Sequence, residues 1–302
     1  MSLARDEASR ESYFAGREKF YKRKVAAIYK DALNDIRKEM SSIYERYAVN
    51  GILSRADMTR YNRLATLEKN ILQILTPAVK SSLKEIDRLR PAEYGEAFFR
   101  TAWAVDNATG VGLTWGPLNK KAITAELDSS PFYMAGKERT LITIPVEVTT
   151  AINKGLAMGQ SYTEMMRDLK GLVNKKAFET MRILRTELHT AQELGTSAAY
   201  DDAAEQGVKG KVVWVATLDG RTRDSHAAMD GVAKDEDGLF HGEITAEYPG
   251  DPALDAADRI NCRCTMIFEL EGFEPTIRRS REDGVIPYQT YGEWKEDKKL
   301  FK

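Results

Sequence analysis

The segment 8–48 constrains the fold more than any other part of the sequence. It contains no proline and one glycine, and its apolar side chains recur every three or four residues, at Phe20, Ala27, Ile28, Ile36, Met40, Ile43 and Tyr47. This spacing is typical of one face of an α-helix, and Gly51 is suited to the left-handed cap that ends it. The sequence therefore predicts a single long helix at the start of the chain.

Further helices are predicted after this segment, with prolines marking their ends. A capping-box pattern opens a helix at Ser54. Pro77 is expected to kink or break it, because proline lacks the backbone N–H that a helical turn needs. Helix is predicted to resume over 81–89, to stop at Pro91 and to form again over 93–104. The first third of the chain is thus predicted to be an all-helical arm or bundle.

Residues 105–145 change character and mark a domain boundary. They are rich in Gly, Thr and Asn, which favours loops, and Leu141–Ile144 is predicted to be a short strand. We therefore predict three parts: a helical N-terminal region over 1–140, a domain over 141–270 and a C-terminal extension over 271–302.

The domain after this boundary is predicted to mix helices with strands. Its expected elements, in order, are helices over 147–159, 161–169 and 175–205, a strand over 211–217, a short helix over 221–229 and a strand over 262–270. The strand 211–217 is rich in β-branched and aromatic side chains. The fold class is therefore predicted as α+β, with a long-helical N-terminal region followed by a mixed α+β C-terminal domain that contains a small sheet.

Composition excludes several classes of protein. The chain has 302 residues, 42% of them hydrophobic, and a net charge of −1, which argues against disorder throughout. Its longest uncharged apolar stretch, Ile71–Val79, is far shorter than the roughly 20 residues of a membrane-spanning helix, and the N-terminus lacks the apolar core of a secretory signal. We therefore expect no membrane partner, and a reducing compartment in which Cys262 and Cys264 form no disulfide framework.

The near-zero net charge hides a gradient along the chain. Residues 1–100 carry a net charge of +6 and residues 201–302 carry −8, and the basic excess is most concentrated at Lys22-Arg23-Lys24. A basic helix face can contact the phosphates of nucleic acid, and it can also be an ordinary solvated surface. Both interpretations stay open for Lys22, Arg23 and Lys24.

Two histidines and both cysteines fall close together in the sequence. Imidazole and thiolate groups are the ligands that zinc prefers, so the candidate metal ligands are His226, His241, Cys262 and Cys264. On a strand, however, the two cysteines would share an apolar face, where free cysteine packs as a small hydrophobic side chain. Core packing, zinc ligation and a reactive thiol all stay open, and no cofactor is certain.

A second group of polar residues follows the strand 211–217, where side chains can build a site. Arg221, Arg223 and His226 can bind an anion, whereas Asp219-Gly220 is also a common turn sequence. No histidine lies at a recognisable spacing from a serine or cysteine nucleophile, and no glycine-rich phosphate loop is present. We therefore predict no catalytic residue.

Four stretches of the C-terminal half, in this order and spacing, are specific enough to indicate a family. They are RILRTELHTAQ (182–192), VVWVATLDGRTRDSHAAMDG (212–231), YPGDP (248–252) and INCRC (260–264). Over roughly Val146–Leu270 the chain resembles the phage Mu F-like minor head, or head morphogenesis, proteins. The positions that carry the likeness are Arg185, Thr186, Glu187, Asp219, Arg221, Thr222, Arg223, His226, Asn261, Cys262 and Cys264.

The resemblance implies a minor capsid protein of a tailed bacteriophage, inside the head near the portal, that acts in procapsid assembly, DNA packaging or early genome ejection. It implies the portal protein as a partner, with the scaffold, the major capsid protein and DNA as further candidates. It implies location in the virion, and in the host cytoplasm during assembly, without an established enzymatic activity. Some relatives carry an enzyme or toxin domain after this segment, and the residues after Leu270 are too few for one.

Two hypotheses cover the polar residues of this segment. In the first, Glu187 pairs with an arginine of the turn and His226 packs near the cysteines, so that the helix 175–205, the turn and the last strand are held together in a structural protein. In the second, a metal-dependent hydrolase or nuclease uses the cluster of His226, His241, Cys262 and Cys264.

Overall fold

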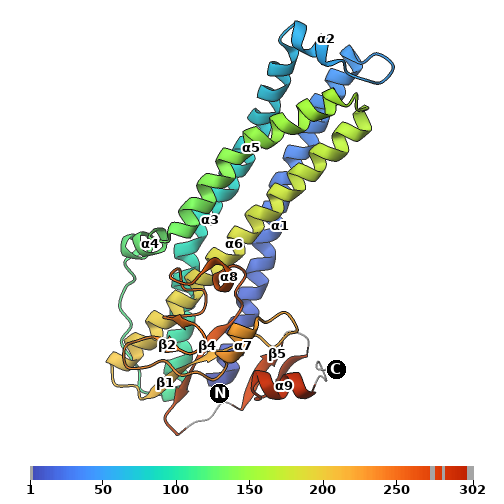
Figure 1. Cartoon of the computed structure of the whole chain (residues 1–302). Coiled ribbons are helices and arrows are strands. Elements are labelled where there is room, and N and C mark those ends of the chain that lie inside the picture. Colours follow the sequence, from blue (N-terminus) through green and yellow to red (C-terminus); the bar gives the residue numbers. More distant parts are fainter. Residues whose placement is uncertain (1–2, 273–275, 281–282, 298–302) are drawn as a thin grey trace. The chain divides into compact units, whose positions relative to one another are not determined.

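The computed structural model describes residues 3–272, 276–280 and 283–297 (Figure 1). Long helices form the N-terminal part and short antiparallel strands follow, so the predicted α+β fold class is confirmed. Parts of the predicted C-terminal extension, 273–275, 281–282 and 298–302, lie outside the described residues. The elements are α1 (Leu3–Tyr47), α2 (Arg55–Arg60), α3 (Arg63–Thr109), α4 (Lys120–Asp128), α5 (Pro131–Ala157), α6 (Tyr162–Glu205), β1 (Gly210–Val215), α7 (Asp224–Ala228), β2 (Phe240–His241), β3 (Thr245–Ala246), α8 (Ala256–Arg259), β4 (Thr265–Leu270), β5 (Ile277–Ser280), β6 (Gly284–Pro287) and α9 (Tyr291–Asp297).

The chain divides into two compact units, each assembled from separated segments. The α+β unit comprises Met1–Glu18, Arg88–Phe132 and Arg185–Lys302, and the helical unit comprises Lys19–Asp87 and Tyr133–Leu184. The helices α1, α3 and α6 therefore each contribute one part to each unit. The predicted limits 1–140, 141–270 and 271–302 follow the chain in order and stay a prediction.

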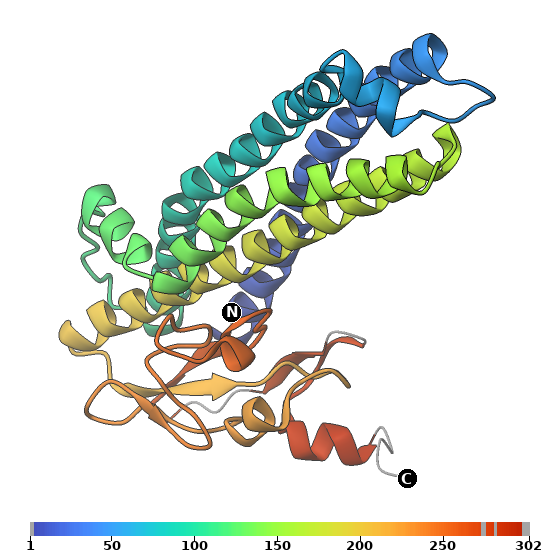
Figure 2. The ribbon, with the colours of Figure 1, turned by 45° about the horizontal axis from the view of Figure 1, so that its top comes forward.

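The helical unit is built from long helices that share apolar faces. Parts of α1, α3, α5 and α6 lie side by side in it (Figure 2). On α1, which confirms the predicted helix 8–48, the side chains of Val25, Tyr29, Ile36 and Met40 are buried at helical spacing. The hydroxyl groups of Tyr29 and Thr180 are 2.7 Å apart and join α1 to α6.

The helix α3 runs without a break through Pro77 and Pro91, so the expected interruptions are wrong. Pro77 and Gln73 lie on the exposed side of the helix. The Gln73 carbonyl has no donor within the helix, because Pro77 has no backbone N–H, and water can bond to it instead. Leu75 and Val79, on the opposite side, are fully buried. Burial of this apolar face keeps the helix continuous despite the missing hydrogen bond.

The strand predicted at Leu141–Ile144 is also wrong, because these residues belong to α5, which contains Pro145. Ile144, Val148 and Ile152 are buried at intervals of four residues. That interval is the period of a helix and not of a strand. Packing of this face outweighs the strand preference of the β-branched residues.

The helix α6 joins the two helices that the sequence predicts separately over 161–169 and 175–205. Its capping box forms as expected: the backbone N–H of Ser161 donates to Glu164 Oε2 at 2.8 Å. The helix continues through Gly171 without a break.

An antiparallel ribbon of β1 and β4 anchors the α+β unit, with Trp214 opposite Met266. The strands predicted over 211–217 and 262–270 are thus confirmed, although each is shorter than expected. Backbone hydrogen bonds of 2.8–2.9 Å join residues 231–234 to the other edge of β1. The remaining strands form two further antiparallel pairs, β2 with β3 and β5 with β6.

The two faces of the ribbon bury different cores. Trp214, Met266 and Phe268 belong to a large apolar core that also contains both cysteines and the α6 residues Ala191, Leu194, Ala199, Tyr200 and Ala203. Val213, Val215 and Ile267 form a small core on the other face. The expected apolar environment of the cysteines is therefore present, although both precede β4.

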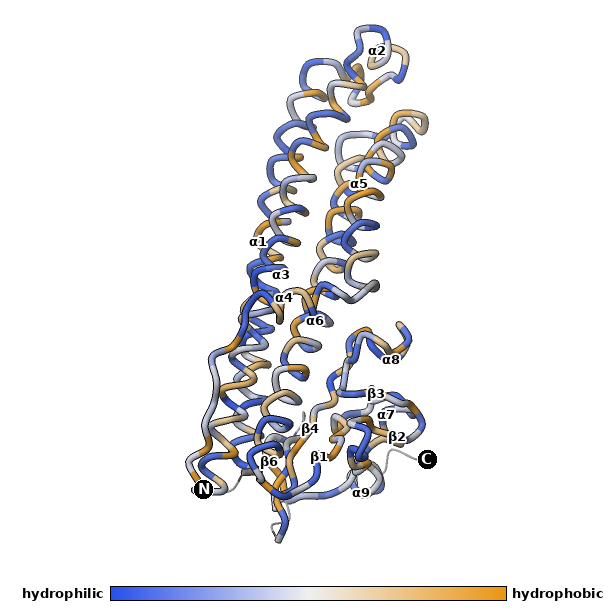
Figure 3. Tube along the Cα trace, turned by 90° about the vertical axis from the view of Figure 1, so that its left-hand side faces the viewer, coloured by the Kyte–Doolittle hydropathy of each residue, from blue (hydrophilic) through white to orange (hydrophobic). Residues whose placement is uncertain are grey.

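Polar and apolar residues are interspersed along the long helices (Figure 3). Among the described residues, no helix combines the length and the apolar character that crossing a membrane requires.

Candidate functional site

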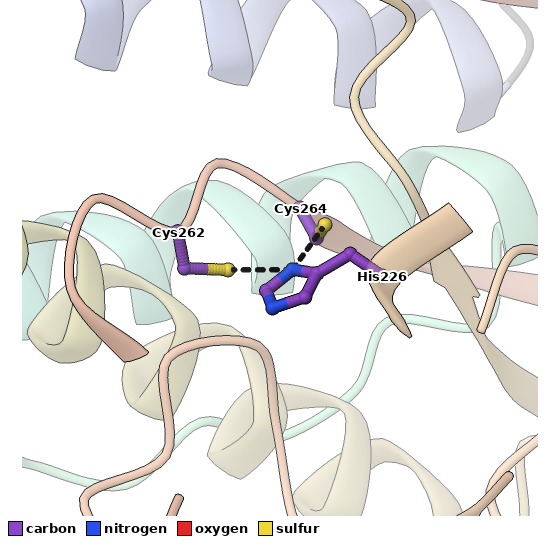
Figure 4. Close-up of side chains that lie close together, drawn as sticks. All are labelled: His226, Cys262 and Cys264. Atoms are coloured by element: carbon purple, nitrogen blue, oxygen red, sulfur yellow. Dashed lines mark hydrogen bonds between the residues drawn. The ribbon is translucent and has the colours of Figure 1, made fainter. Parts of the chain in front are cut away.

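His226, Cys262 and Cys264 meet in the interior of the α+β unit (Figure 4). Nδ1 of His226 lies 3.2 Å from Sγ of Cys264 and 3.6 Å from Sγ of Cys262. One ligand atom from each residue lies within 4.8 Å of the others, and each residue is 2% exposed. We call these three residues the His-Cys cluster. It contains three of the four metal ligands that the sequence suggests.

The other two histidines also lie in the α+β unit but are not part of the His-Cys cluster. His241 on β2 is exposed, and its Nε2 is 2.6 Å from Asp237 Oδ2, a hydrogen bond that raises the pKa of His241. His189 on α6 is buried, and burial lowers its pKa to about 3, so its ring is neutral. The structure therefore does not bring His241 to the two sulfurs.

Local chain geometry positions each member of the His-Cys cluster. His226 lies on α7, the short helix after the turn that follows β1. Cys262 and Cys264 lie between α8 and β4, directly after Asn261, whose φ of 58° is left-handed and is tolerated by a short polar side chain. The backbone N–H of Asn261 donates to Thr186 Oγ1 on α6 at 3.2 Å. This hydrogen bond ties the cysteine segment to α6.

The two sulfurs have unlike environments. Burial raises the pKa of the Cys262 thiol, and its hydrogen bond with Cys264 raises that pKa further. Burial also acts to raise the pKa of Cys264, but hydrogen bonds with Cys262 and His226 outweigh it and hold this pKa well below its usual value. Backbone amides contribute as well: that of Thr217 bonds to the Cys264 sulfur, and that of Cys264 bonds to the Cys262 sulfur. The site therefore favours the thiolate form of Cys264 and the thiol form of Cys262.

A carboxylate contacts the opposite side of the His226 ring. Nε2 lies 3.4 Å from Asp258 Oδ1, and Ser225 Oγ donates a 2.8 Å hydrogen bond to the same oxygen. The Trp214 ring meets the imidazole edge to face, with centroids 6.1 Å apart. These contacts orient the ring so that Nδ1 faces the sulfurs.

A cavity of about 200 Å³ lies beside the His-Cys cluster. Besides the cluster, its lining consists of guanidinium, hydroxyl and amide side chains, from Arg185, Thr217, Arg221, Thr222, Arg223, Asn261 and Arg263. Most of the positions that carry the family resemblance therefore surround one polar cavity.

The arginines of the cavity have partners of their own. Arg263 forms a bidentate pair with Asp219, in which Nη2 donates to Oδ1 at 2.9 Å. Arg223 donates to two backbone carbonyls at the end of α8, at 3.2 and 2.5 Å. Arg185 lies 3.6 Å from a carboxylate of α1, and the Arg221 side chain is 70% exposed. Arg263 and Arg185 thus face a carboxylate, and carbonyl oxygens hold Arg223 in place.

The turn after β1 depends on Asp219. Its Oδ1 accepts a 2.9 Å hydrogen bond from the backbone N–H of Arg221, which is the arrangement of an Asx-turn. Thr222 Oγ1 donates to the Thr217 carbonyl, and Thr217 Oγ1 donates to the Arg263 carbonyl at 2.5 Å. Asp219 and Thr222 therefore shape the turn and connect it to the cysteine segment.

Residues 146–267 match the family model described as Phage Mu protein F like protein. This segment is therefore similar to the phage Mu protein F-like family. The match confirms the resemblance over roughly 146–270. The Mu F-like segment includes the His-Cys cluster and every residue of the adjacent cavity.

Three relatives extend beyond this segment. The chain is 29% identical over 287 residues to the minor head protein GP7 of Bacillus phage SPP1, which covers 92% of each chain. It is 28% identical over 280 residues to an Enterococcus faecalis protein named NAD(+)–arginine ADP-ribosyltransferase EFV, which covers 90% of this chain and 56% of that protein. A Haemophilus influenzae protein is 27% identical over 178 residues, 58% of this chain and 36% of its own length. No solved structure matches the chain.

Glu187 of the Mu F-like segment has partners other than those expected. Arg259 Nη2 on α8 donates to its Oε1 at 2.6 Å, and Arg90 Nε on α3 lies 3.3 Å from its Oε2. Burial raises the pKa of Glu187, and the two arginines oppose that rise. The expected pairing with an arginine of the turn is wrong, because backbone carbonyls already bind Arg223 and Arg221 extends into solvent.

Sequence reasoning missed three contacting residues of the Mu F-like segment, Asp258, Arg259 and Arg263. Arg263 lies between the two cysteines of the INCRC motif, and Asp258-Arg259 directly precedes that motif. Adjacency to the motif was thus the available signal. The local pattern does not show which of the many carboxylates over 231–260 reaches His226, because this depends on how the chain returns from α8 to β4.

Lys22, Arg23 and Lys24 lie on α1 in the helical unit and outside this site. Arg23 and Lys24 are exposed. Lys24 Nζ lies 3.8 Å from Glu85 Oε1 and 5.1 Å from the centroid of the Phe20 ring. Binding of nucleic acid by these residues stays a prediction.

Proposed function

We propose that this chain is a minor head protein of a tailed bacteriophage that acts in head morphogenesis. The observation that carries the proposal is the alignment with GP7 of phage SPP1, which covers 92% of both chains. The family match over residues 146–267 is a second, separate observation that supports it.

The proposal includes a location inside the head near the portal, and a role in procapsid assembly, DNA packaging or early genome ejection. The portal protein is the primary partner, and the scaffold, the major capsid protein and DNA are further candidates. Assembly takes place in the host cytoplasm. The exposed Arg23 and Lys24 on α1 support a surface that contacts DNA, because cations there can neutralise phosphates.

We propose a structural role rather than an enzymatic one. The relative whose name describes an ADP-ribosyltransferase aligns over 56% of its length, so that name describes a longer protein than the aligned part. A metal-dependent hydrolase or nuclease is the second candidate, since three potential ligands adjoin a polar cavity. The 2% exposure of those ligands favours the structural role, because a substrate could hardly reach them.

Co-purification with the portal protein encoded in the same genome tests the proposal. The full chain is the right material, because residues 1–140 contain parts of both compact units. We expect an untagged full-length chain to co-elute with tagged portal protein, and not with a tagged unrelated protein. Absence of co-elution from cells that also make the scaffold and the major capsid protein would contradict the proposed partner.

A salt titration of DNA binding by the full chain tests the second partner. Contacts to phosphate release counterions, so the binding constant is expected to fall steeply as salt rises. Binding that does not respond to salt would contradict a phosphate-contacting surface. Assays for nuclease activity with added Zn²⁺ on the same preparation test the enzymatic alternative.

A further inference from the structure

We propose that His226, Cys262 and Cys264 bind one zinc ion, through Nδ1 of the imidazole and the two sulfurs, and that the ion holds α7 against the segment that leads into β4. This site goes beyond the proposed role in the phage head. It would stabilise the α+β unit whichever head component the protein contacts.

The two nitrogen–sulfur distances in the cluster fit a tetrahedral zinc ion. Zinc binds sulfur at about 2.3 Å and imidazole nitrogen at about 2.0–2.1 Å, so tetrahedral angles put nitrogen and sulfur about 3.6 Å apart. Nδ1 of His226 lies 3.6 Å from Sγ of Cys262 and 3.2 Å from Sγ of Cys264. Both sulfurs also face the same ring nitrogen, as Figure 4 shows. A simple hydrogen bond between one thiol and the imidazole would need only one of these two nitrogen–sulfur contacts.

The groups around the ligands are those that support a metal. Histidine ligands almost always use their second ring nitrogen to bond a carboxylate, carbonyl or water, which fixes the ring. Here Asp258 Oδ1 faces Nε2 of His226 at 3.4 Å, although the two atoms form no hydrogen bond in this structure, and Ser225 holds the Asp258 carboxylate in place. Backbone amides are hydrogen-bonded to both sulfurs, an arrangement that stabilises thiolate ligands.

Charge balance also favours a divalent cation. Two thiolates and one divalent cation sum to zero, so binding of the ion by both sulfurs leaves the buried cluster without net charge. The nearby guanidinium groups do not oppose the cation strongly, because Arg263 is paired with Asp219 and Arg223 is bound to carbonyl oxygens. Sulfur and imidazole ligands select zinc over magnesium, calcium or manganese, which prefer oxygen.

The adjacent cavity can supply the fourth ligand. Its volume is about 200 Å³, and a water molecule takes about 30 Å³ of liquid volume, so several waters fit. A site with three protein ligands and one water completes a tetrahedron. The burial of all three residues makes the ion a cross-link between α7 and the cysteine segment, two short stretches with little regular structure of their own.

Metal analysis of the purified full chain tests the site directly. The chain is made without a histidine tag, loaded with Zn²⁺ and dialysed, and we expect one zinc per chain by elemental mass spectrometry. Replacement of zinc by Co²⁺ is expected to give the intense thiolate-to-cobalt absorption of sulfur ligation. His241→Ala is the matched control, because His241 is exposed and is not part of the His-Cys cluster, and this variant should keep one zinc.

Three variants then assign the ligands. Cys262→Ser and Cys264→Ser are expected to lose stoichiometric zinc and the cobalt–thiolate absorption. Asp258→Asn keeps all three ligands and is expected to bind zinc about 10–100-fold more weakly, the usual effect of removing a carboxylate behind a ligating histidine. This variant keeps the test decisive if a cysteine variant does not fold.

Four results would overturn the proposal. They are a wild-type chain that binds no stoichiometric zinc, Co²⁺ binding without thiolate absorption, a cysteine variant that keeps one zinc, and a Cys262–Cys264 disulfide in the freshly purified chain. Intact mass and thiol titration under denaturing conditions detect the last of these, because a disulfide lowers the mass by two hydrogens and removes both free thiols.

Discussion

The two compact units of the chain bury charge very differently. In the helical unit, Lys176 is the buried charged side chain among the described residues, and its partners Glu147 and Glu179 are partly exposed. In the α+β unit, charged side chains from all three of its segments are buried, namely Glu7, Arg10, Arg90, Glu93, Glu187, Glu193, Asp219, Asp251, Arg259 and Arg278. Apolar faces on regular helices are sufficient in the first unit. The second unit adds ion pairs that connect its short elements.

This contrast suggests where each unit is vulnerable. A buried ion pair adds little net stability compared with apolar packing, but the loss of one partner leaves a charge without compensation. The helical unit should therefore tolerate loss of charge, and the α+β unit should not. Trp103, Trp115, Trp214 and Trp294 all lie in the α+β unit, so tryptophan fluorescence reports its unfolding selectively, and far-ultraviolet circular dichroism reports both units.

The largest expected effect is that of Glu187→Gln. Glu187 lies between Arg90 and Arg259, and neutralising it removes the carboxylate that they share, although Arg90 keeps its pair with Asp128 at 2.7 Å. We expect a loss of about 3–5 kcal/mol of unfolding free energy, measured by urea titration of tryptophan fluorescence.

The matched change in the helical unit is Lys176→Met. Its carboxylate partners can turn to solvent, so we expect a loss of about 1 kcal/mol or less, measured by circular dichroism. Equal losses for the two variants would contradict the contrast between the units.

Replacing either of two glycines of α6 by alanine is expected to give the next largest change in unfolding free energy, with opposite signs at the two positions. A Cβ at Gly195 would lie 2.3 Å from the Tyr94 carbonyl oxygen on α3, whereas a Cβ at Gly171 meets nothing within 4 Å. Gly195→Ala is therefore expected to cost about 1–3 kcal/mol by overpacking. Gly171→Ala is expected to stabilise the helix by up to about 1 kcal/mol, since alanine is the better helix former. Thermal unfolding of both variants checks the signs, and a stabilising Gly195→Ala would show that α3 and α6 are not in close contact.

Local sequence patterns predicted α1, the capping box of α6 and the strands of the ribbon, because each depends on neighbours in sequence. They failed at Pro77 and Pro145, where the local penalty of a proline is outweighed by apolar burial that only the folded chain reveals. The candidate site shows the same division. The order of the motifs brought His226 and the cysteines into one candidate set. The contact of Asp258 with His226 depends on the path of the backbone between α8 and β4, which no local pattern encodes.

A pH dependence is expected from the first turns of α1. Glu7 is buried, accepts hydrogen bonds from the Phe268 N–H at 3.1 Å and the Tyr200 hydroxyl at 2.8 Å, and lies near Arg10 and Glu11. Burial raises its pKa from 4.5 to about 7, an effect that Arg10 opposes.

Between these two pH values the folded chain holds a proton that the unfolded chain has released. Stability from this group is therefore full below about pH 4.5 and falls as pH rises to about 7, by up to about 3 kcal/mol. Glu7→Gln is expected to flatten this part of the curve, measured as urea midpoints from pH 4.5 to 8. An unchanged slope in the variant would assign the pH dependence to other groups.

The smallest effect on stability is expected from replacing Lys22, Arg23 and Lys24 together by glutamine. Lys24 and Glu85 are 3.8 Å apart and both are solvated, so this surface pair should contribute less than about 1 kcal/mol. Binding of DNA is the informative measurement. The log of the binding constant falls with the log of the salt concentration, and this dependence becomes less steep by about 0.9 for each phosphate that the protein no longer neutralises. A slope that falls by the equivalent of two or three phosphates, with unchanged unfolding, would make these residues a phosphate-contacting surface. An unchanged slope would make them the solvated face that any long helix carries. The two units would then differ in how their stability depends on buried charge, and not in DNA binding.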